Sequence, residues 1–148
     1  EVDQFFKACS NLLTKDGLIA IQMISSSDCR YDQLKNSVDF IQKHIFPGSL
    51  LLSLERVIRS TSTTSDLQLD CVNDYAESYA KTLRMWRDNF NAAESEIRKL
   101  GFGDEFIRKW NYYFCYCEAA FATKQIGLLR VVLTRPNNQL LATARALK

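Results

Sequence analysis

Glycine and histidine are scarce in this chain, and their scarcity limits the chemistry that it can carry. Only five of 148 residues are glycine, and they form no glycine-rich turn of the kind that brings backbone amides close to a nucleotide cofactor. The one histidine, His44, falls near the expected end of a helix, where contact with the helix dipole or solvent is favoured over catalysis. Without a GxSxG motif or an acid partner for His44, a serine or cysteine hydrolase has little support.

Long apolar runs, paired cysteines and excess charge are also lacking. No apolar run approaches the roughly 18 residues of a membrane-spanning helix, and the first residues do not resemble a signal peptide, so we expect a soluble chain. The five cysteines include no CxxC pair and no metal-ligand spacing, so no metal site is expected. Cys115 and Cys117 face different sides of a helix and should not form a disulfide. A net charge of +2 argues against a nucleic-acid partner.

What is present is an alternation of strand-like and helical segments. Residues 18–25 form a short run rich in β-branched residues, which predicts a buried strand of a parallel sheet. Apolar and polar residues alternate over 67–71, which indicates a strand near an edge of the sheet, and 128–134 reads as the final strand. The alternation predicts an α/β fold in one domain.

The helical segments are read from apolar residues at helical spacing and from caps and stops at their ends. Ser53 is a plausible N-cap, and Gly101-Phe102-Gly103 reads as a turn between two helices. After the first strand, Ser26, Ser27 and Asp28 form a polar loop, at the position where open α/β sheets bind ligands. We expect helices over residues 2–13, 31–44 and 76–100, a short one within 50–64 that the polar STSTTS segment ends, and one that begins at Gly103 or Asp104 and contains 108–121. The tail from 139 reads as a weak short helix or a frayed end.

The segment from Arg108 to Phe121 carries the densest pattern in the chain. If it is helical, one apolar stripe contains a phenol, that of Tyr113, which needs a hydrogen-bond partner because a buried unpaired polar group costs about 1 to 3 kcal/mol. Two interpretations stay open: Tyr113 belongs to a site, or it is a core tyrosine bonded to a backbone carbonyl. The stripe consists of Trp110, Tyr113, Phe114, Cys117 and Phe121.

Aromatic residues concentrate in the second half of the chain. Such a face suits an apolar substrate pocket with a few polar groups, but it is equally typical of an aromatic core. The residues concerned are Tyr75, Tyr79, Trp86, Trp110, Tyr112, Tyr113 and Tyr116.

Several segments together resemble a known family. They are FFKACSNLLTKDGLIAIQ near the start, DFIQKHIFPG at 39–48, YAKTLRMW at 79–86, WNYYFCYCEAAF at 110–121 and VVLTRP at 131–136. In this order they are similar to the C-terminal half of the cyclopropane-fatty-acyl-phospholipid synthases, within the mycolic acid cyclopropane synthase family of S-adenosylmethionine-dependent methyltransferases.

The resemblance implies a Rossmann-like class I methyltransferase sheet with additional helices packed over it. It implies that residues 1–148 are the C-terminal part of a single methyltransferase domain, with the cofactor loop and most of the S-adenosylmethionine site upstream of Glu1. The implied reaction transfers a methylene group to a cis double bond of a phospholipid acyl chain at a membrane surface, with bicarbonate accepting a proton. The resemblance further implies a cytoplasmic, peripherally membrane-associated enzyme, with a homodimer among its expected assemblies, and it implies that this piece alone is inactive.

The resemblance also assigns site residues. Tyr113 matches a tyrosine beside the bicarbonate site, Asn73 stands where bacterial members have histidine, and the backbone amide of Tyr75 is expected at the same anion. Substrate-binding positions are Phe46, Tyr79 and Tyr112, and no metal is implied.

Asp74, Ala76 and Glu118 depart from the usual pattern of the family. An acidic residue at position 74 would repel an anion if it faced inward. Two alternatives therefore stay open: a degenerate, non-catalytic lipid-binding or assembly module, and a lipid methyltransferase that stops at a methyl branch.

Overall fold

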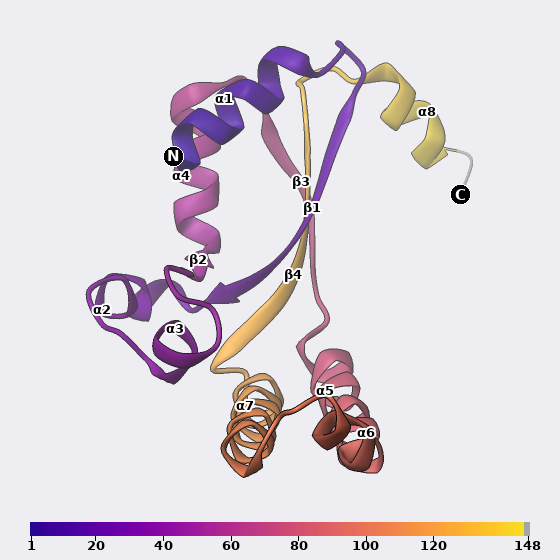
Figure 1. Ribbon diagram of the computed structural model, residues 1–148. Helices are drawn as coiled ribbons and strands as arrows, with labels where there is room; N and C mark the ends of the chain where they lie inside the picture. The colour runs from indigo at the N-terminus through magenta and orange to yellow at the C-terminus, as the bar shows by residue number, and fades with distance from the viewer. Residues whose placement is uncertain (147–148) are drawn as a thin grey trace.

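The computed structural model describes residues 1–146, and its centre is a four-stranded sheet in the order β2-β1-β4-β3 (Figure 1). The strands are β1 (Leu18–Ser26), β2 (Leu52–Ser53), β3 (Gln68–Asp74) and β4 (Ile126–Thr134). Strand β4 is antiparallel to both β1 and β3, while β1 and β2 are parallel. The predicted final strand and the predicted edge strand are confirmed, and the class is α/β.

The prediction that residues 18–25 form a buried strand of a parallel sheet is wrong in two respects. Strand β1 pairs along its whole length with antiparallel β4, and its parallel partner β2 has only two residues. Only one face of β1 is covered, so Leu18, Ala20 and Gln22 are exposed in this chain. Alternation of covered and open faces is what antiparallel sheets allow.

Helices α1 (Val2–Leu12) and α4 (Leu54–Thr64) lie together on one face of the sheet (Figure 1). Phe6 and Val57 of these helices meet the fully buried Val131 and Leu133 of β4 in one hydrophobic cluster. The expected cap is present, because the Ser53 hydroxyl accepts a hydrogen bond of 3.1 Å from the Arg56 amide.

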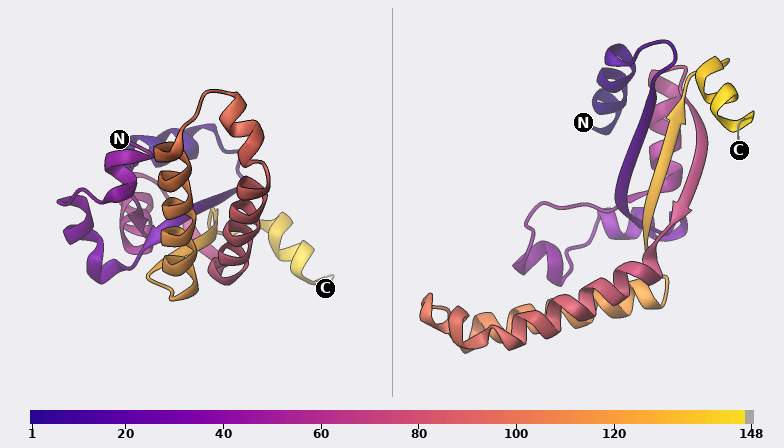
Figure 2. Two further views of the ribbon diagram at one scale, coloured as in Figure 1. Left: turned by 60° about the horizontal axis from the view of Figure 1, so that its bottom comes forward. Right: turned by 90° about the vertical axis from the view of Figure 1, so that its right-hand side faces the viewer.

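A helical hairpin extends beyond the end of the sheet (Figure 2). It consists of α5 (Ala76–Ala92), α6 (Glu94–Lys99) and α7 (Asp104–Ala122). One uninterrupted helix over 76–100 was the wrong expectation: the backbone leaves helical geometry at Ala93, with ψ of 11°, and Leu100 is 76% exposed. The predicted interhelical turn is confirmed, with Gly101 at φ +93°, a conformation that favours glycine.

The expected helix over 31–44 is also two helices, α2 (Tyr31–Lys35) and α3 (Phe40–His44), preceded by the short η1 (Asp28–Arg30). A new helix begins at Asp39 because its carboxylate accepts from the Gln42 amide while the Gln42 side chain accepts from the Asp39 amide, a capping box. Of the two interpretations of the tail, the structure has the helix, α8 (Gln139–Ala146), and residues 147–148 lie outside the described residues.

Candidate functional site

An apolar cavity of about 280 Å³ lies where the hairpin meets the end of the sheet. The floor comes from Ile24 of β1 and Ile126 of β4, and the walls come from α5, α7 and the segment around α3. Leu83 and Phe121, which are 0% and 1% exposed, connect the cavity to the hydrophobic core of the hairpin. The cavity therefore extends from the folded core of the hairpin to the surface, where its lining residues Phe46 and Tyr116 are 50% and 39% exposed.

Tyr113 lines this cavity from α7 and is half-buried. Its ring is edge-on to Trp110, with centroids 5.3 Å apart, and to Phe46 at 6.0 Å. Burial, together with the neighbouring Cys117 thiol, raises the pKa of Tyr113 to about 12. The phenol is therefore neutral and can donate a hydrogen bond at physiological pH. The Cys117 thiol, one turn further along α7, is the neighbouring side chain that adds to this rise.

Cys117 is buried one turn further along α7, next to Tyr113. Burial raises the pKa of its thiol to about 11, against a smaller opposing effect of the hydrogen bond with Tyr113. A thiol that stays protonated is a poor nucleophile. We therefore interpret Cys117 as a packing residue in the cavity wall rather than as a reactive group. The full stripe predicted from periodicity, including Phe114, is buried or half-buried as expected.

Polar groups at the rim of the cavity come from residues that the sequence did not single out. Arg30 donates to the Gln125 side chain over 2.7 Å, and Gln42 donates to the Ser49 carbonyl over 2.7 Å. These groups are paired with each other or with backbone. The Asp39-x-x-Gln42 spacing of the capping box was a signal that could have located part of this rim.

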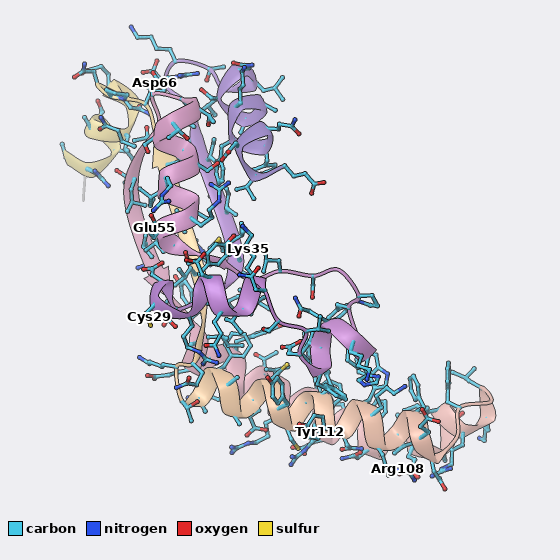
Figure 3. All side chains as sticks on the ribbon, turned by 90° about the vertical axis from the view of Figure 1, so that its left-hand side faces the viewer. Cys29, Lys35, Glu55, Asp66, Arg108 and Tyr112 are labelled. Carbon is cyan, nitrogen blue, oxygen red and sulfur yellow. The ribbon has the colours of Figure 1, made fainter. Side chains whose placement is uncertain are left out.

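The three predicted substrate-binding residues are not all in one place. Phe46 and Tyr79 line the cavity, and Tyr79 packs edge-on against Phe121 at 4.9 Å. Tyr112 does not line it: its side chain is 52% exposed, and its ring is stacked with Tyr116 at 5.9 Å and edge-on to Phe40. Figure 3 shows Tyr112 on α7, where the helix passes α3.

Asn73 and Tyr75 lie at the end of β3, outside the lining of this cavity. The Tyr75 amide donates to the Leu128 carbonyl over 2.8 Å, so it is already used within the fold. Asn73 is exposed, and its carboxamide oxygen accepts from the Cys71 thiol. The structure therefore does not bring these two residues into the cavity with Tyr113.

The departures at positions 74 and 118 have structural partners. One oxygen of Asp74 accepts from the Ala76 amide over 2.9 Å and from the Leu128 amide over 3.2 Å, which ties the start of α5 to β4. Glu118 binds Arg84 of α5 through both Nε and a terminal nitrogen, at 2.8 and 2.6 Å. Neither carboxylate lines the cavity.

His44 is exposed in the last turn of α3, and its ring packs against Phe40 at 5.1 Å. Over residues 1–146 no group of histidine, cysteine or acidic side chains has the arrangement of a metal site. Within the same range no helix is long and apolar enough to cross a bilayer. The five cysteines are all free thiols.

Comparison with known proteins gives a consistent result. A family model described as mycolic acid cyclopropane synthetase matches residues 1–131. The chain is 33% identical over 132 residues to tuberculostearic acid methyltransferase UfaA1 of Mycobacterium tuberculosis, covering 89% of this chain and 31% of that protein. It is 28% identical over 145 residues to the cyclopropane-fatty-acyl-phospholipid synthase of Escherichia coli strain K12, covering 97% and 36%.

Solved structures agree on the fold. The cyclopropane synthase MmaA2 from Mycobacterium tuberculosis superposes with a TM-score of 0.79 at 20% identity, covering 90% of this chain and 50% of that one. CmaA1, solved in complex with SAH and CTAB, has the same TM-score and coverage at 22% identity. The fold is that of the class I methyltransferases. The chain spans about a third of the length of the curated relatives it matches. Over this span, the chain belongs to the mycolic acid cyclopropane synthetase family.

Proposed function

We propose that the protein containing this chain transfers a methylene group from S-adenosylmethionine to a cis double bond of a phospholipid acyl chain. The observation that carries the proposal is the apolar cavity with the neutral phenol of Tyr113 in its wall. A hydrocarbon chain matches such a lining, and a few polar groups are enough to orient it. The name of the Escherichia coli relative supports the choice of a phospholipid.

This chain's own residues would hold and desolvate the acyl chain. Ile24, Leu83 and Phe121 present hydrocarbon and exclude water. The aromatic faces of Tyr79 and Tyr113 can stabilise positive charge that develops on the chain. The Tyr113 hydroxyl, protonated below its pKa of about 12, can donate a hydrogen bond to an anion.

The described residues do not fit S-adenosylmethionine on their own. Gly17 precedes β1 and Gly127 lies inside β4. Neither therefore forms a glycine turn after the carboxyl end of a strand, where backbone amides could contact the cofactor. We therefore assign no cofactor contact to residues 1–146. Bicarbonate fits them only in part, because Tyr113 offers a donor while the Tyr75 amide is bonded to Leu128.

We also propose that the protein meets its lipid at a membrane surface. Leu100 and Phe102 are exposed at the far end of the hairpin, where an apolar side chain can enter the interface of a bilayer (Figure 2). Arg108 and Lys109 follow on α7 and suit anionic headgroups.

The test uses the full-length protein, unsaturated phosphatidylglycerol vesicles and methyl-labelled S-adenosylmethionine. We expect label in the acyl chain and the upfield NMR signals of cyclopropane protons. Lipid recovered without label, from a protein that binds the cofactor, would refute the proposal.

A second candidate is a lipid methyltransferase that stops at a methyl branch. It is favoured by the relative with 33% identity, which is named a methyltransferase. The same assay separates the two, since a methyl branch carries label without cyclopropane signals.

A non-catalytic lipid-binding module is the third candidate. It is favoured by the Tyr75 amide, which is occupied by Leu128, and by the carboxylate at position 74. Calorimetry of the full-length protein with S-adenosylmethionine separates this candidate from the two enzymes. Only the non-catalytic module is compatible with a protein that does not bind the cofactor.

A further inference from the structure

Two opposite charges stand at the rim of the apolar cavity. Arg30 comes from η1, which follows β1, and Asp39 comes from the start of α3. Within residues 1–146 they are the only charged side chains in the cavity lining. These two residues therefore set the electrostatics of the entrance, while the lining behind them is apolar or uncharged.

The two charges lie near the same side chain of α7, that of Tyr116. Burial is the main cause that raises the pKa of the Tyr116 phenol; the Asp39 carboxylate adds to this rise, and the Arg30 guanidinium opposes it. Partly exposed charges act only over about 8 to 10 Å in physiological salt, so both are close to this phenol. Tyr116 lines the cavity and is 39% exposed, which places the pair where the cavity opens to solvent.

Neither charge is neutralised by an ion pair within the described part of the chain. Arg30 uses one terminal nitrogen to donate to the Gln125 side chain over 2.7 Å. Asp39 uses Oδ1 to accept from the Gln42 amide over 2.8 Å. The other terminal nitrogen of Arg30 and Oδ2 of Asp39 are therefore available to a ligand.

The same hydrogen bonds hold the two charges in position. Gln125 lies between α7 and β4, so its contact ties Arg30 to the opposite side of the cavity. Asp39 is fixed by the capping box, in which the Gln42 side chain accepts from the Asp39 amide and also donates to the Ser49 carbonyl. Charges that are fixed before a ligand arrives bind it with little loss of side-chain entropy.

We propose that Arg30 and Asp39 bind the zwitterionic headgroup of phosphatidylethanolamine, Arg30 at its phosphate and Asp39 at its ammonium group. The inference rests on the proposed function, because the acyl chain of the same lipid occupies the apolar cavity. A guanidinium fork matches phosphate oxygens, and a carboxylate oxygen accepts a charge-assisted hydrogen bond from a primary ammonium. Phosphatidylglycerol offers Arg30 the same phosphate but brings no cation to Asp39, so it should bind less tightly.

The test measures binding to the full-length protein without cofactor or turnover. Monomeric dihexanoyl lipids with ethanolamine, choline or glycerol headgroups are titrated by calorimetry into the unmodified protein, Arg30→Gln and Asp39→Asn. Asparagine keeps the helix cap, since its side-chain oxygen can accept from the Gln42 amide. The control variants are Asp32→Asn and Lys35→Gln, which remove exposed charges on α2 outside the cavity lining.

We expect the unmodified protein to bind the ethanolamine lipid about ten-fold more tightly than the glycerol lipid, the range for a hydrogen bond between charged groups. The choline lipid should lie between them, because its ammonium carries no N–H. Asp39→Asn should abolish the preference for ethanolamine, and Arg30→Gln should weaken the binding of all three lipids about ten-fold. Both control variants should bind as the unmodified protein does.

Equal binding of the ethanolamine and glycerol lipids by the unmodified protein would contradict the inference, as would a preference that survives in Asp39→Asn or a lack of binding by all three lipids. Should Arg30→Gln fail to fold, Arg30→Lys replaces it, and its loss of the guanidinium fork should still weaken binding. A protein that modifies acyl chains without regard to the headgroup contradicts this inference and leaves the proposed function standing. A protein that binds the ethanolamine lipid through both residues but transfers no label contradicts the proposed function alone.

Discussion

Tyr113 shows how one polar group is placed within an apolar stripe. Helical spacing puts it between Trp110 and Cys117 on the covered face of α7, and the fold then turns that face toward the cavity. Its raised pKa follows from burial and keeps the phenol protonated. The spacing predicted the inward direction, while the cavity itself depends on side chains from β1, α3 and α5.

We expect Tyr113→Phe in the full-length protein to lower turnover about ten-fold or more, because a hydrogen-bond donor to a charged group is lost. Folding should be little affected, since the ring and its contacts with Trp110 and Phe46 remain. The measurement is the initial rate of label transfer to lipid, with thermal unfolding recorded alongside.

Tyr31→Phe is the matched control, because Tyr31 lies on α2 and does not line the cavity. Equal rates for Tyr113→Phe and the unmodified protein would remove Tyr113 from the reaction.

At the level of elements, the contact between α5 and α7 includes an ion pair that the family pattern did not predict. Glu118, whose side chain is 14% exposed, binds Arg84 across the two helices. We expect a double-mutant cycle of Arg84→Ala and Glu118→Ala to give a coupling free energy of about 0.2 to 1 kcal/mol, the range for pairs with an exposed partner.

Urea unfolding of the four proteins of the cycle at low and high salt measures this coupling. It should shrink at high salt because ionic strength screens exposed charges. Additive effects of the two substitutions at low salt would show that the pair does not stabilise the hairpin.

The contact between α1 and α4 depends on pH through Asp3. Hydrogen bonds from Ser60 and Arg56 lower the pKa of Asp3 below its ordinary value of 3.8. A lowered pKa in the folded state adds stability at pH values above 3.8, and this stability is lost as the pH falls through the lowered pKa.

We therefore expect stability to fall more steeply below about pH 4 in the unmodified protein than in Asp3→Asn. Unfolding by urea at a series of pH values measures the two slopes. Parallel curves over this range would contradict the predicted role of Asp3.

The sequence predicted most elements but not how they are divided or joined. Pattern located α1, α4, α7 and the strands β1, β3 and β4, but not the two-residue β2. It missed the breaks at Asn36 and Ala93, since local caps and turns decide where a helix ends and apolar spacing continues across them. It also missed that Arg130 lies opposite Gln22 and Asn73 in the sheet, because cross-strand neighbours are set by pairing between distant segments.

For the molecule as a whole, the acyl cavity and the cofactor site should be separable. The cavity is formed within residues 1–146, whereas those residues contain no glycine-rich turn after a strand.

We expect the 148-residue chain to bind oleate, which changes the fluorescence of Trp110 near the cavity, but to give no calorimetric signal with S-adenosylmethionine at concentrations that saturate the full-length protein. Circular dichroism confirms that the isolated chain is folded, and Leu83→Trp, which fills the cavity, serves as the control that should lose oleate binding. If the isolated chain bound the cofactor as tightly as the full-length protein does, its own residues would form the cofactor site. That result would contradict the predicted separation of the acyl cavity from the cofactor site.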